Sequence, residues 1–195
     1  MLILKKIAVT GCIGSGKTTV CSYLKDQNFY LCDADKIGHD LLNKNNEKII
    51  DLFGNEVVKD GQIDRKILAT KVFNNKDKLK SLEELLHPQI LREIEKQYET
   101  VKSDNYRYFL VDIALLFEMK HQAFYDWIIM IETTKDNGKK RFIEKGFASE
   151  DFEKRTANFL SKDMKKTHFV IENNKTIKDL YQQVDSVIDQ IDSKN

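Results

Sequence analysis

Eight consecutive residues decide the fold of this chain: Gly11-Cys12-Ile13-Gly14-Ser15-Gly16-Lys17-Thr18. They fit the pattern GxxxxGK(S/T) at every fixed position, and they stand between a β-rich segment, Leu4–Thr10, and a helical one, Lys17–Gln27. Glycines let backbone amides turn inward around phosphate oxygens, and the N-terminus of the following helix adds its positive dipole end. The stretch therefore predicts a phosphate-binding loop between a strand and a helix of an α/β fold.

The last residues of this loop carry its chemistry. Lys17 can reach the β- and γ-phosphates of a nucleoside triphosphate, and the Thr18 hydroxyl is placed to hold Mg²⁺. A chance match in a chain of 195 residues is on the order of one in a hundred, which argues against a glycine turn that merely joins strand to helix. We expect ATP as phosphoryl donor and Mg²⁺ as cofactor. The predicted ATP-binding residues are Gly11, Gly14, Ser15, Gly16, Lys17, Thr18 and Thr19.

Short apolar segments alternate with helical ones along the rest of the chain. The segments that resemble buried strands are Phe29–Cys32, Tyr108–Val111, Trp127–Ile131 and Phe169–Ile171. Such alternation is typical of a parallel sheet with helices on both faces. The sequence therefore predicts a three-layer α/β fold with a parallel sheet.

The clearest helix of the chain is the last one. Its apolar residues recur at helical spacing and form one stripe, and Thr176 with Asp179 makes a start that resembles a capping box. The stripe consists of Ile177, Leu180, Tyr181, Val184, Val187, Ile188 and Ile191. This pattern predicts an amphipathic helix that covers one face of the sheet.

A long helical region lies in the middle of the chain. Residues 35–53 look helical, Val57–Lys59 is a candidate extended piece, and residues 64–102 are helical, with Asp64 as a candidate cap. We expect interruptions near Asn74-Asn75 and at Pro88, where proline would start a new helix. His87, just before it, is either a substrate-pocket residue or a side chain at a helix boundary. The other histidines, His39, His121 and His168, show no ligand spacing.

Three carboxylates follow predicted strands. Asp33 and Asp35 lie just past the second strand and Asp112 ends the third, and in open parallel sheets ligands sit beyond these ends. Asp35 is the candidate base that accepts a proton from the acceptor hydroxyl, and the alternatives are that it helps to hold the metal or caps the helix that begins near residue 35. Asp33 either has a functional role or caps this helix. Asp112 is a candidate partner of Mg²⁺.

Composition narrows the class of protein. Lys and Arg total 32 against 31 Asp and Glu, so no basic surplus points to nucleic acid. The longest apolar runs have five residues, far fewer than the roughly twenty that span a membrane. The three cysteines, Cys12, Cys21 and Cys32, have no metal-type spacing and are interpreted as small apolar fillers. We expect a cytoplasmic protein with no membrane or nucleic-acid partner.

Five segments together resemble the dephospho-coenzyme A kinase family. They run in the order of that family across most of the chain, and the last four are specific where the phosphate loop alone would be generic. The segments are Thr10–Thr19, Cys32–Asp35, Ile63–Leu68 with Val72-Phe73, Leu86–Ile90 and Asp112–Glu118.

The resemblance implies transfer of the γ-phosphoryl group of ATP to the ribose 3′-hydroxyl of dephospho-coenzyme A, with Asp35 as the base. It implies one P-loop kinase domain over residues 1–195, with a core at 1–59, 106–137 and 166–195. A helical substrate-binding insertion would occupy about 60–105 and a lid helix about 138–165. Catalysis would use Asp35, Lys17 and Arg141, and the substrate would contact Asp33, His87, Leu115 and Leu116. We expect a monomer.

The chain departs from the family pattern mainly near the lid. Cys12 replaces a glycine at a variable position of the loop, and Ala114 replaces a proline before Leu115. Lys145 follows Arg141 where the family tends to have a second arginine, and Phe159 stands in place of a glutamine. Arg141 itself is either a clamp on phosphates or part of a solvated charged face.

Two other functions compete with this interpretation. A nucleoside or nucleotide kinase would share the loop but phosphorylate another hydroxyl or phosphate. A nucleotide switch of the GTPase type would need a guanine-reading Asn-Lys-x-Asp segment, and the nearest candidate, Asn75-Lys76-Asp77, lacks the spacer.

Overall fold

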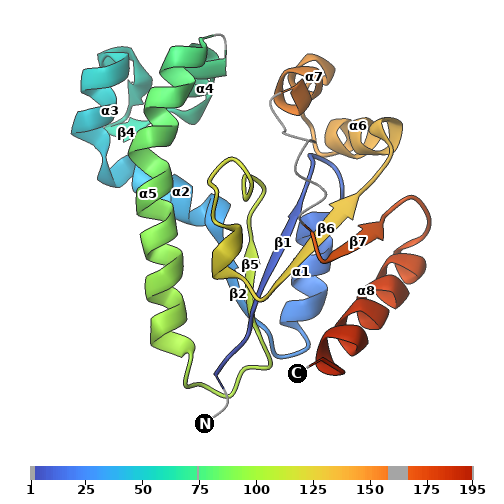
Figure 1. The fold of residues 1–195 in the computed structure, drawn as a ribbon. Coiled ribbons are helices and arrows are strands. Elements are labelled where there is room, and N and C mark those ends of the chain that lie inside the picture. Colours follow the sequence, from blue (N-terminus) through green and yellow to red (C-terminus); the bar gives the residue numbers. More distant parts are fainter. Residues whose placement is uncertain (1–2, 74, 158–166, 195) are drawn as a thin grey trace. The chain divides into compact units, whose positions relative to one another are not determined.

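The computed structural model of the chain describes residues 3–73, 75–157 and 167–194 (Figure 1). The chain divides into two compact units. The first unit combines Met1–Asp33 with Thr100–Asn195, and the second is Ala34–Glu99. Each unit is described by itself below.

The first unit is built on a sheet whose five described strands all run parallel. In spatial order they are β2 (Tyr30–Asp33), β5 (Phe109–Asp112), β1 (Lys6–Gly11), β6 (Trp127–Glu132) and β7 (Phe169–Glu172). The parallel sheet and its strands were predicted, and both are confirmed. Because β1 lies at the centre, the loop that follows it emerges in the middle of the carboxyl edge of the sheet.

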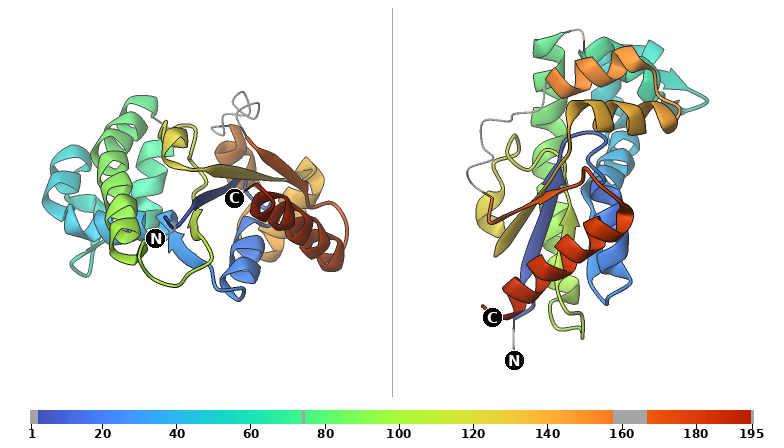
Figure 2. Two further views of the ribbon diagram at one scale, coloured as in Figure 1. Left: turned by 60° about the horizontal axis from the view of Figure 1, so that its bottom comes forward. Right: turned by 90° about the vertical axis from the view of Figure 1, so that its right-hand side faces the viewer.

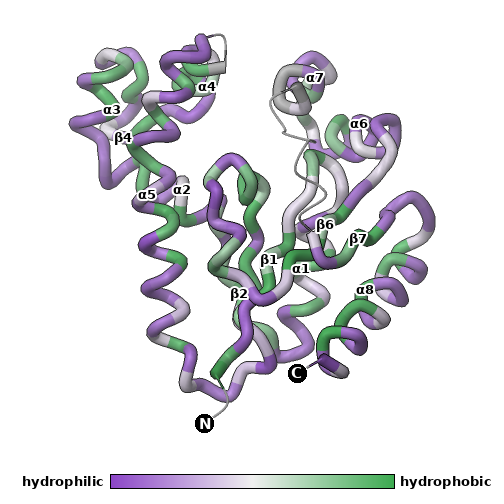
Figure 3. The backbone as a smooth tube through the Cα atoms, viewed as in Figure 1, coloured by the Kyte–Doolittle hydropathy of each residue, from purple (hydrophilic) through white to green (hydrophobic). Residues whose placement is uncertain are grey.

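Helices α1 (Lys17–Lys25) and α8 (Ile177–Asp192) cover one face of this sheet (Figure 2). Apolar residues concentrate in the central strands, and α8 alternates between apolar and polar positions (Figure 3). Alternate strand residues form one core with the two helices, as Val9, Leu110 and Ile131 do with Leu24 and Val184. The strand residues between them are buried too, among them Ala8, Phe109, Val111, Ile128 and Met130. The central strands therefore bury side chains on both faces of the sheet.

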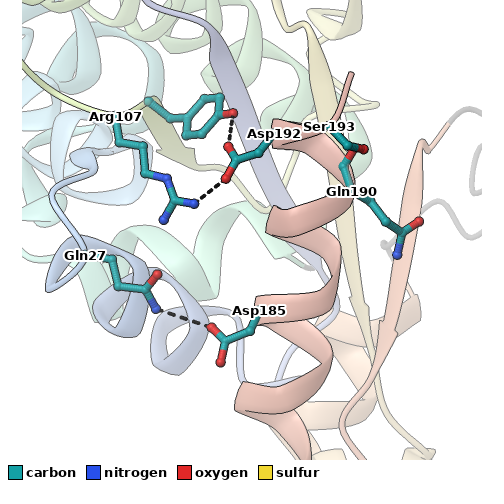
Figure 4. A network of polar contacts seen from close by, with 7 residues as sticks. Gln27, Arg107, Asp185, Gln190, Asp192 and Ser193 are labelled. Carbon is teal, nitrogen blue, oxygen red and sulfur yellow. Dashed lines mark hydrogen bonds and ion pairs between the residues drawn. The ribbon is translucent and has the colours of Figure 1, made fainter. Parts of the chain in front are cut away.

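Polar contacts fix α8 at both ends and along its length, and Figure 4 shows those of Asp185 and Asp192. Thr176 and Asp179 form the predicted capping box. Farther along, the Tyr23 hydroxyl of α1 donates to Asp185 at 2.9 Å. At the last turn, the Tyr108 hydroxyl donates to Asp192 at 2.6 Å, and Arg107 forms an ion pair with the same carboxylate.

The outer strand β7 is also tied to α8, through Gln183. Its side-chain amide donates to the Glu172 carbonyl at 3.0 Å, and its carbonyl oxygen accepts from the Glu172 amide at 3.2 Å. One side chain thus satisfies both backbone groups of a residue in the strand at the end of the sheet.

The second unit is mainly helical (Figure 1). A hairpin of β3 (Val58–Lys59) and β4 (Gln62–Ile63) turns at Asp60-Gly61, where both residues have positive φ. The predicted extended piece was one strand of this hairpin. The other elements are α2 (Ala34–Lys44), α3 (Asn46–Phe53), a 3₁₀ turn η1 (Asn55–Val57), α4 (Arg65–Phe73) and α5 (Lys76–Val101). Asp64 caps α4 as predicted, because its carboxylate accepts from the Lys66 and Ile67 amides at 2.8 and 3.2 Å.

The expected helix break at Pro88 is wrong, since α5 runs through it as one helix of 26 residues. A proline inside a helix costs roughly 3 kcal/mol because it removes one backbone hydrogen bond and crowds the preceding turn. Buried residues on both sides offset this cost at about 1.5–3 kcal/mol each, namely Leu86, Ile90 and Ile94. His87 is consequently an interior residue of a helix and not a boundary residue.

The region predicted as one lid helix contains two helices in its described part. Helix α6 (Lys135–Glu144) ends before Gly146, which has φ of +85°, and α7 (Ser149–Ala157) follows. Phe159 lies outside the described residues. A further short turn, η2 (Gln122–Phe124), precedes β6. Across the described ranges, we find no helix that combines the length and the apolar character needed to cross a bilayer.

Candidate active site

The glycine loop joins the central strand β1 to α1, so the N-terminus of α1 faces whatever the loop holds. Gly16 is the N-cap of α1, with φ of +96°, and no side chain caps this helix end. The first turn also contains no acidic residue. The free amides and the positive end of the helix dipole are therefore left for an external anion such as a phosphate.

Two glycines of the loop are required by neighbouring residues. A Cβ on Gly14 would overlap the backbone of Gly138 in α6, and a Cβ on Gly16 would overlap the side-chain amide of Asn173. Gly14 and Gly16 both have positive φ as well. The lack of side chains thus lets α6 and the residue after β7 touch the loop directly.

Lys17 forms an ion pair with Asp112, and both side chains are about nine-tenths buried. Asp112 lies beside Val9 on β1 and beside Asp33 on β2, so the ends of three strands bring these charged groups to one edge. Burial raises the pKa of the nearby Cys21 thiol to about 12, although the Lys17 ammonium acts in the opposite direction. The structure therefore brings together Lys17, Asp33 and Asp112, which sequence reasoning had placed at this edge.

The oxygen donors at this edge fit a magnesium ion. The Thr18 hydroxyl is exposed at the start of α1, and the Asp112 carboxylate lies next to Lys17. Within the described ranges, no three His, Cys, Asp or Glu side chains are grouped so as to hold a metal by themselves. A hydroxyl with one carboxylate is the kind of donor set from which Mg²⁺ is held when nucleotide phosphates and waters supply the other ligands.

Arg141, from α6, reaches the back of the glycine loop. Its guanidinium donates to the Gly14 carbonyl at 3.3 Å, to the Thr133 hydroxyl at 3.3 Å and to the Asn173 carbonyl at 3.0 Å. This half-buried arginine is thus bonded to the loop and is not part of a solvated face. Gly138 lies within α6 at the point of contact with the loop.

Asn173 is a residue that sequence reasoning missed. It is buried, follows β7 directly, and its amide donates to the Ser15 carbonyl at 2.8 Å. Its backbone amide also donates to the Glu132 carbonyl on β6, and its backbone carbonyl accepts from Arg141, so the loop, β6 and Arg141 meet at this one residue. A polar residue at the carboxyl end of a parallel strand was the available signal.

The remaining predicted residues have different environments. Leu116 is completely buried in the core, whereas Leu115 is 40% exposed and can meet a ligand. Asp35 and His87 belong to the second unit. Asp35 is exposed in the first turn of α2, two residues after β2 ends. His87 is half-buried in α5, and this burial lowers its pKa. Thr19 is exposed in the first turn of α1.

A parallel sheet with a GxxxxGKT loop between its central strand and α1 defines the class of P-loop nucleotide-binding proteins. Comparisons with known proteins narrow this class. The model of one family, described as "Dephospho-CoA kinase", matches residues 5–179. The chain belongs to the dephospho-CoA kinase family.

The chain is also similar to individual proteins and solved structures. A dephospho-CoA kinase from Chlamydia pneumoniae is 37% identical over 192 residues, which cover 95% of each chain. The structure of a dephospho-CoA kinase from Campylobacter jejuni superposes with a TM-score of 0.72 at 32% identity, covering 97% of this chain and 98% of the other. A crystal structure of a Thermus thermophilus protein gives a TM-score of 0.82 at 25% identity, with the same coverage.

Proposed function

We propose that this chain transfers the γ-phosphoryl group of ATP to the ribose 3′-hydroxyl of dephospho-coenzyme A, giving coenzyme A and ADP. The observation that carries the proposal is the family match over residues 5–179, which spans the glycine loop and every proposed site residue. The uncapped start of α1, beside Lys17 and Asp112, supports a phosphate ligand at this place.

On the donor side, we assign binding of the ATP phosphates to the loop amides and to Lys17. When ATP binds, the Lys17 ammonium would break its ion pair with Asp112 and contact the β- and γ-phosphates. Thr18 and Asp112 would hold Mg²⁺, which neutralises charge on the phosphate oxygens when it is bound. Arg141 already donates to the Gly14 carbonyl of the phosphate loop, and in this scheme its planar guanidinium would stabilise charge on the transferring group.

On the acceptor side, we assign Asp35 as the base. Its carboxylate would accept the proton of the 3′-hydroxyl while the 3′-oxygen bonds to the γ-phosphorus and the bond to the β,γ-bridging oxygen breaks. Asp33, His87 and Leu115 would contact the substrate, with Leu116 supporting Leu115 from the core. In this scheme the helical insertion of about 60–105 binds substrate and residues 138–165 serve as lid.

Product analysis tests this function. Purified protein incubated with Mg·ATP and dephospho-coenzyme A should give a product one phosphate heavier, and NMR should place that phosphate on the 3′-oxygen. Replacing Lys17 by Ala should reduce turnover by orders of magnitude with the fold intact, since it removes the charge facing the phosphates. Equal catalytic efficiency with free adenosine would instead favour a nucleoside kinase.

A further inference from the structure

The face of α2 that carries Asp35, the proposed base, also carries His39. His39 follows Asp35 by four residues, which places the two side chains one helical turn apart on the same face. Both are exposed, whereas the opposite side of α2 is buried at Ile37 and meets Ile90 of α5 at Gly38. The face with Asp35 and His39 is therefore the one that a ligand of this unit can reach.

Arg65 joins this face from another element. Its guanidinium lies 3.0 Å from the His39 ring nitrogens. The arginine is held in place from both sides of its backbone. The Ile63 amide before it donates to Asn43 of α2 at 3.3 Å, and Asp64 caps the turn that begins with Arg65. The start of α4 is thus fixed to α2 next to His39.

The charge of Arg65 is not neutralised by this contact. In the described part of the chain, no carboxylate forms an ion pair with Arg65, and a histidine ring supplies no negative charge. A guanidinium has five donors, and its contact with the ring uses only a part of them. Arginine with unused donors in a planar fork is suited to bind phosphate oxygens.

We propose that Arg65, positioned by His39, binds the 5′-diphosphate of dephospho-coenzyme A while Asp35 takes the proton from the 3′-hydroxyl. The inference rests on the proposed function and adds the part of the substrate that this face recognises. One helical turn, about 5.4 Å, separates Asp35 from His39, which holds Arg65. This distance is comparable to the span of one ribose between its 3′-oxygen and its 5′-phosphate, so one ribose can reach both Asp35 and Arg65. The diphosphate would supply the negatively charged partner that the Arg65 guanidinium does not have in its contact with His39.

Steady-state kinetics of Arg65→Gln test this assignment. At saturating ATP, the variant should raise KM for dephospho-coenzyme A about 10- to 100-fold, because charged hydrogen bonds are lost. Its KM for ATP should stay at the parent value. The inhibition constant of adenosine, measured in competition with dephospho-coenzyme A, should also stay unchanged, since adenosine has no diphosphate.

Lys66→Gln is the matched control. Lys66 is the next residue, exposed on the same helical turn, and the substitution removes the same charge. It should leave every constant within about twofold of the parent. Added salt should raise the parent's KM for dephospho-coenzyme A steeply and that of Arg65→Gln only weakly, because screening acts on the ion contact. A purely structural arginine would not produce this difference in salt dependence.

His39 is a positioning residue in this proposal. His39→Leu should raise KM several-fold with kcat preserved, and His39→Gln, which keeps a hydrogen-bond acceptor, should restore most of the loss. Parent-like KM for Arg65→Gln, or equal weakening of dephospho-coenzyme A and adenosine, would overturn the inference and leave the kinase function in place. A parent protein that does not phosphorylate dephospho-coenzyme A would overturn the proposed function itself.

Discussion

Asp35 is the residue on which the proposed chemistry depends most directly. Asn has the same size and can still accept a hydrogen bond, but it cannot take a proton. Asp35→Asn should therefore bind both substrates almost normally and lose roughly 10²–10⁴-fold in kcat. The measurement is a kcat determination over a series of Mg²⁺ concentrations for parent and variant.

The magnesium series separates three roles for this carboxylate. A loss that is partly relieved at high Mg²⁺ would mean that Asp35 mainly holds the metal. If Asp35 only supports the start of α2, asparagine would serve about as well, and both activity and melting temperature would stay near the parent values. Activity within a few-fold of the parent at all metal concentrations would end the assignment as base.

Single residues of the site differ in how far sequence predicts them. The loop residues from Gly11 to Thr18 could be predicted because their chemistry is local and their spacing is fixed. Asn173 could not, because its contact with Ser15 depends on β7 lying two strands from β1. Arg141 was a candidate from its charge and from the family resemblance, and only the fold shows that its guanidinium donates to the Gly14 carbonyl.

At the scale of elements, local signals were sufficient where a side chain acts within its own helix. The caps at Asp64 and Thr176 and the apolar stripe of α8 are of this kind. At Pro88 the local signal was misleading. Proline predicted a helix break, but the burial of Leu86 and Ile90 stabilises α5 as one helix through this position. The hairpin at Asp60-Gly61 was missed since each of its strands has only two residues.

The attachment of the last helix leads to a prediction about pH. Burial alone would raise the pKa of Asp192, but hydrogen bonds from Tyr108 and Arg107 outweigh it and hold this pKa below 3.8. The ionised Asp192 carboxylate therefore stabilises the folded state fully above about pH 4, and this stabilisation is lost as the pH falls through the lowered pKa that Asp192 has in the folded protein. Asp192→Asn should lower the free energy of unfolding at pH 7, because it removes the ion pair with Arg107. The loss should be only about 1 kcal/mol, because solvent screens the partly exposed side chains of Arg107 and Asp192.

Urea unfolding at pH 7 and pH 3.5 checks this prediction. The difference between parent and Asp192→Asn should shrink at the lower pH. Asp189→Asn, on the exposed side of the same helix, is the control and should change little at either pH. A deficit that is equal or larger at pH 3.5 would contradict the proposed role of the carboxylate.

The whole molecule divides at a place that sequence did not mark. The second unit starts at Ala34, directly after β2, whereas the sequence analysis placed residues 1–59 together in the core. A parallel sheet could be predicted from alternating apolar segments, but its strand order could not, because apolar strands of similar length do not specify their neighbours.

Ligand binding to the whole molecule gives a further prediction. ATP with Mg²⁺ and dephospho-coenzyme A should each raise the melting temperature, by roughly 5–10 °C at a hundred times the dissociation constant. Lys17→Ala should lose the response to ATP and keep the response to dephospho-coenzyme A. A nucleotide switch would respond to a nucleoside triphosphate and show no shift with dephospho-coenzyme A, and that result would contradict the assignment.

The two hydrogen bonds between the Gln183 side chain and the Glu172 backbone affect how the protein behaves at high concentration. A strand at the end of a sheet offers unpaired backbone groups to any other extended chain, which is a common start of aggregation. Here the side-chain amide of Gln183 occupies both groups of one edge residue, in the way that a neighbouring strand would. A strand from a second molecule would first have to displace an amide that α8 holds in position, so the helix that covers the sheet also protects its open edge.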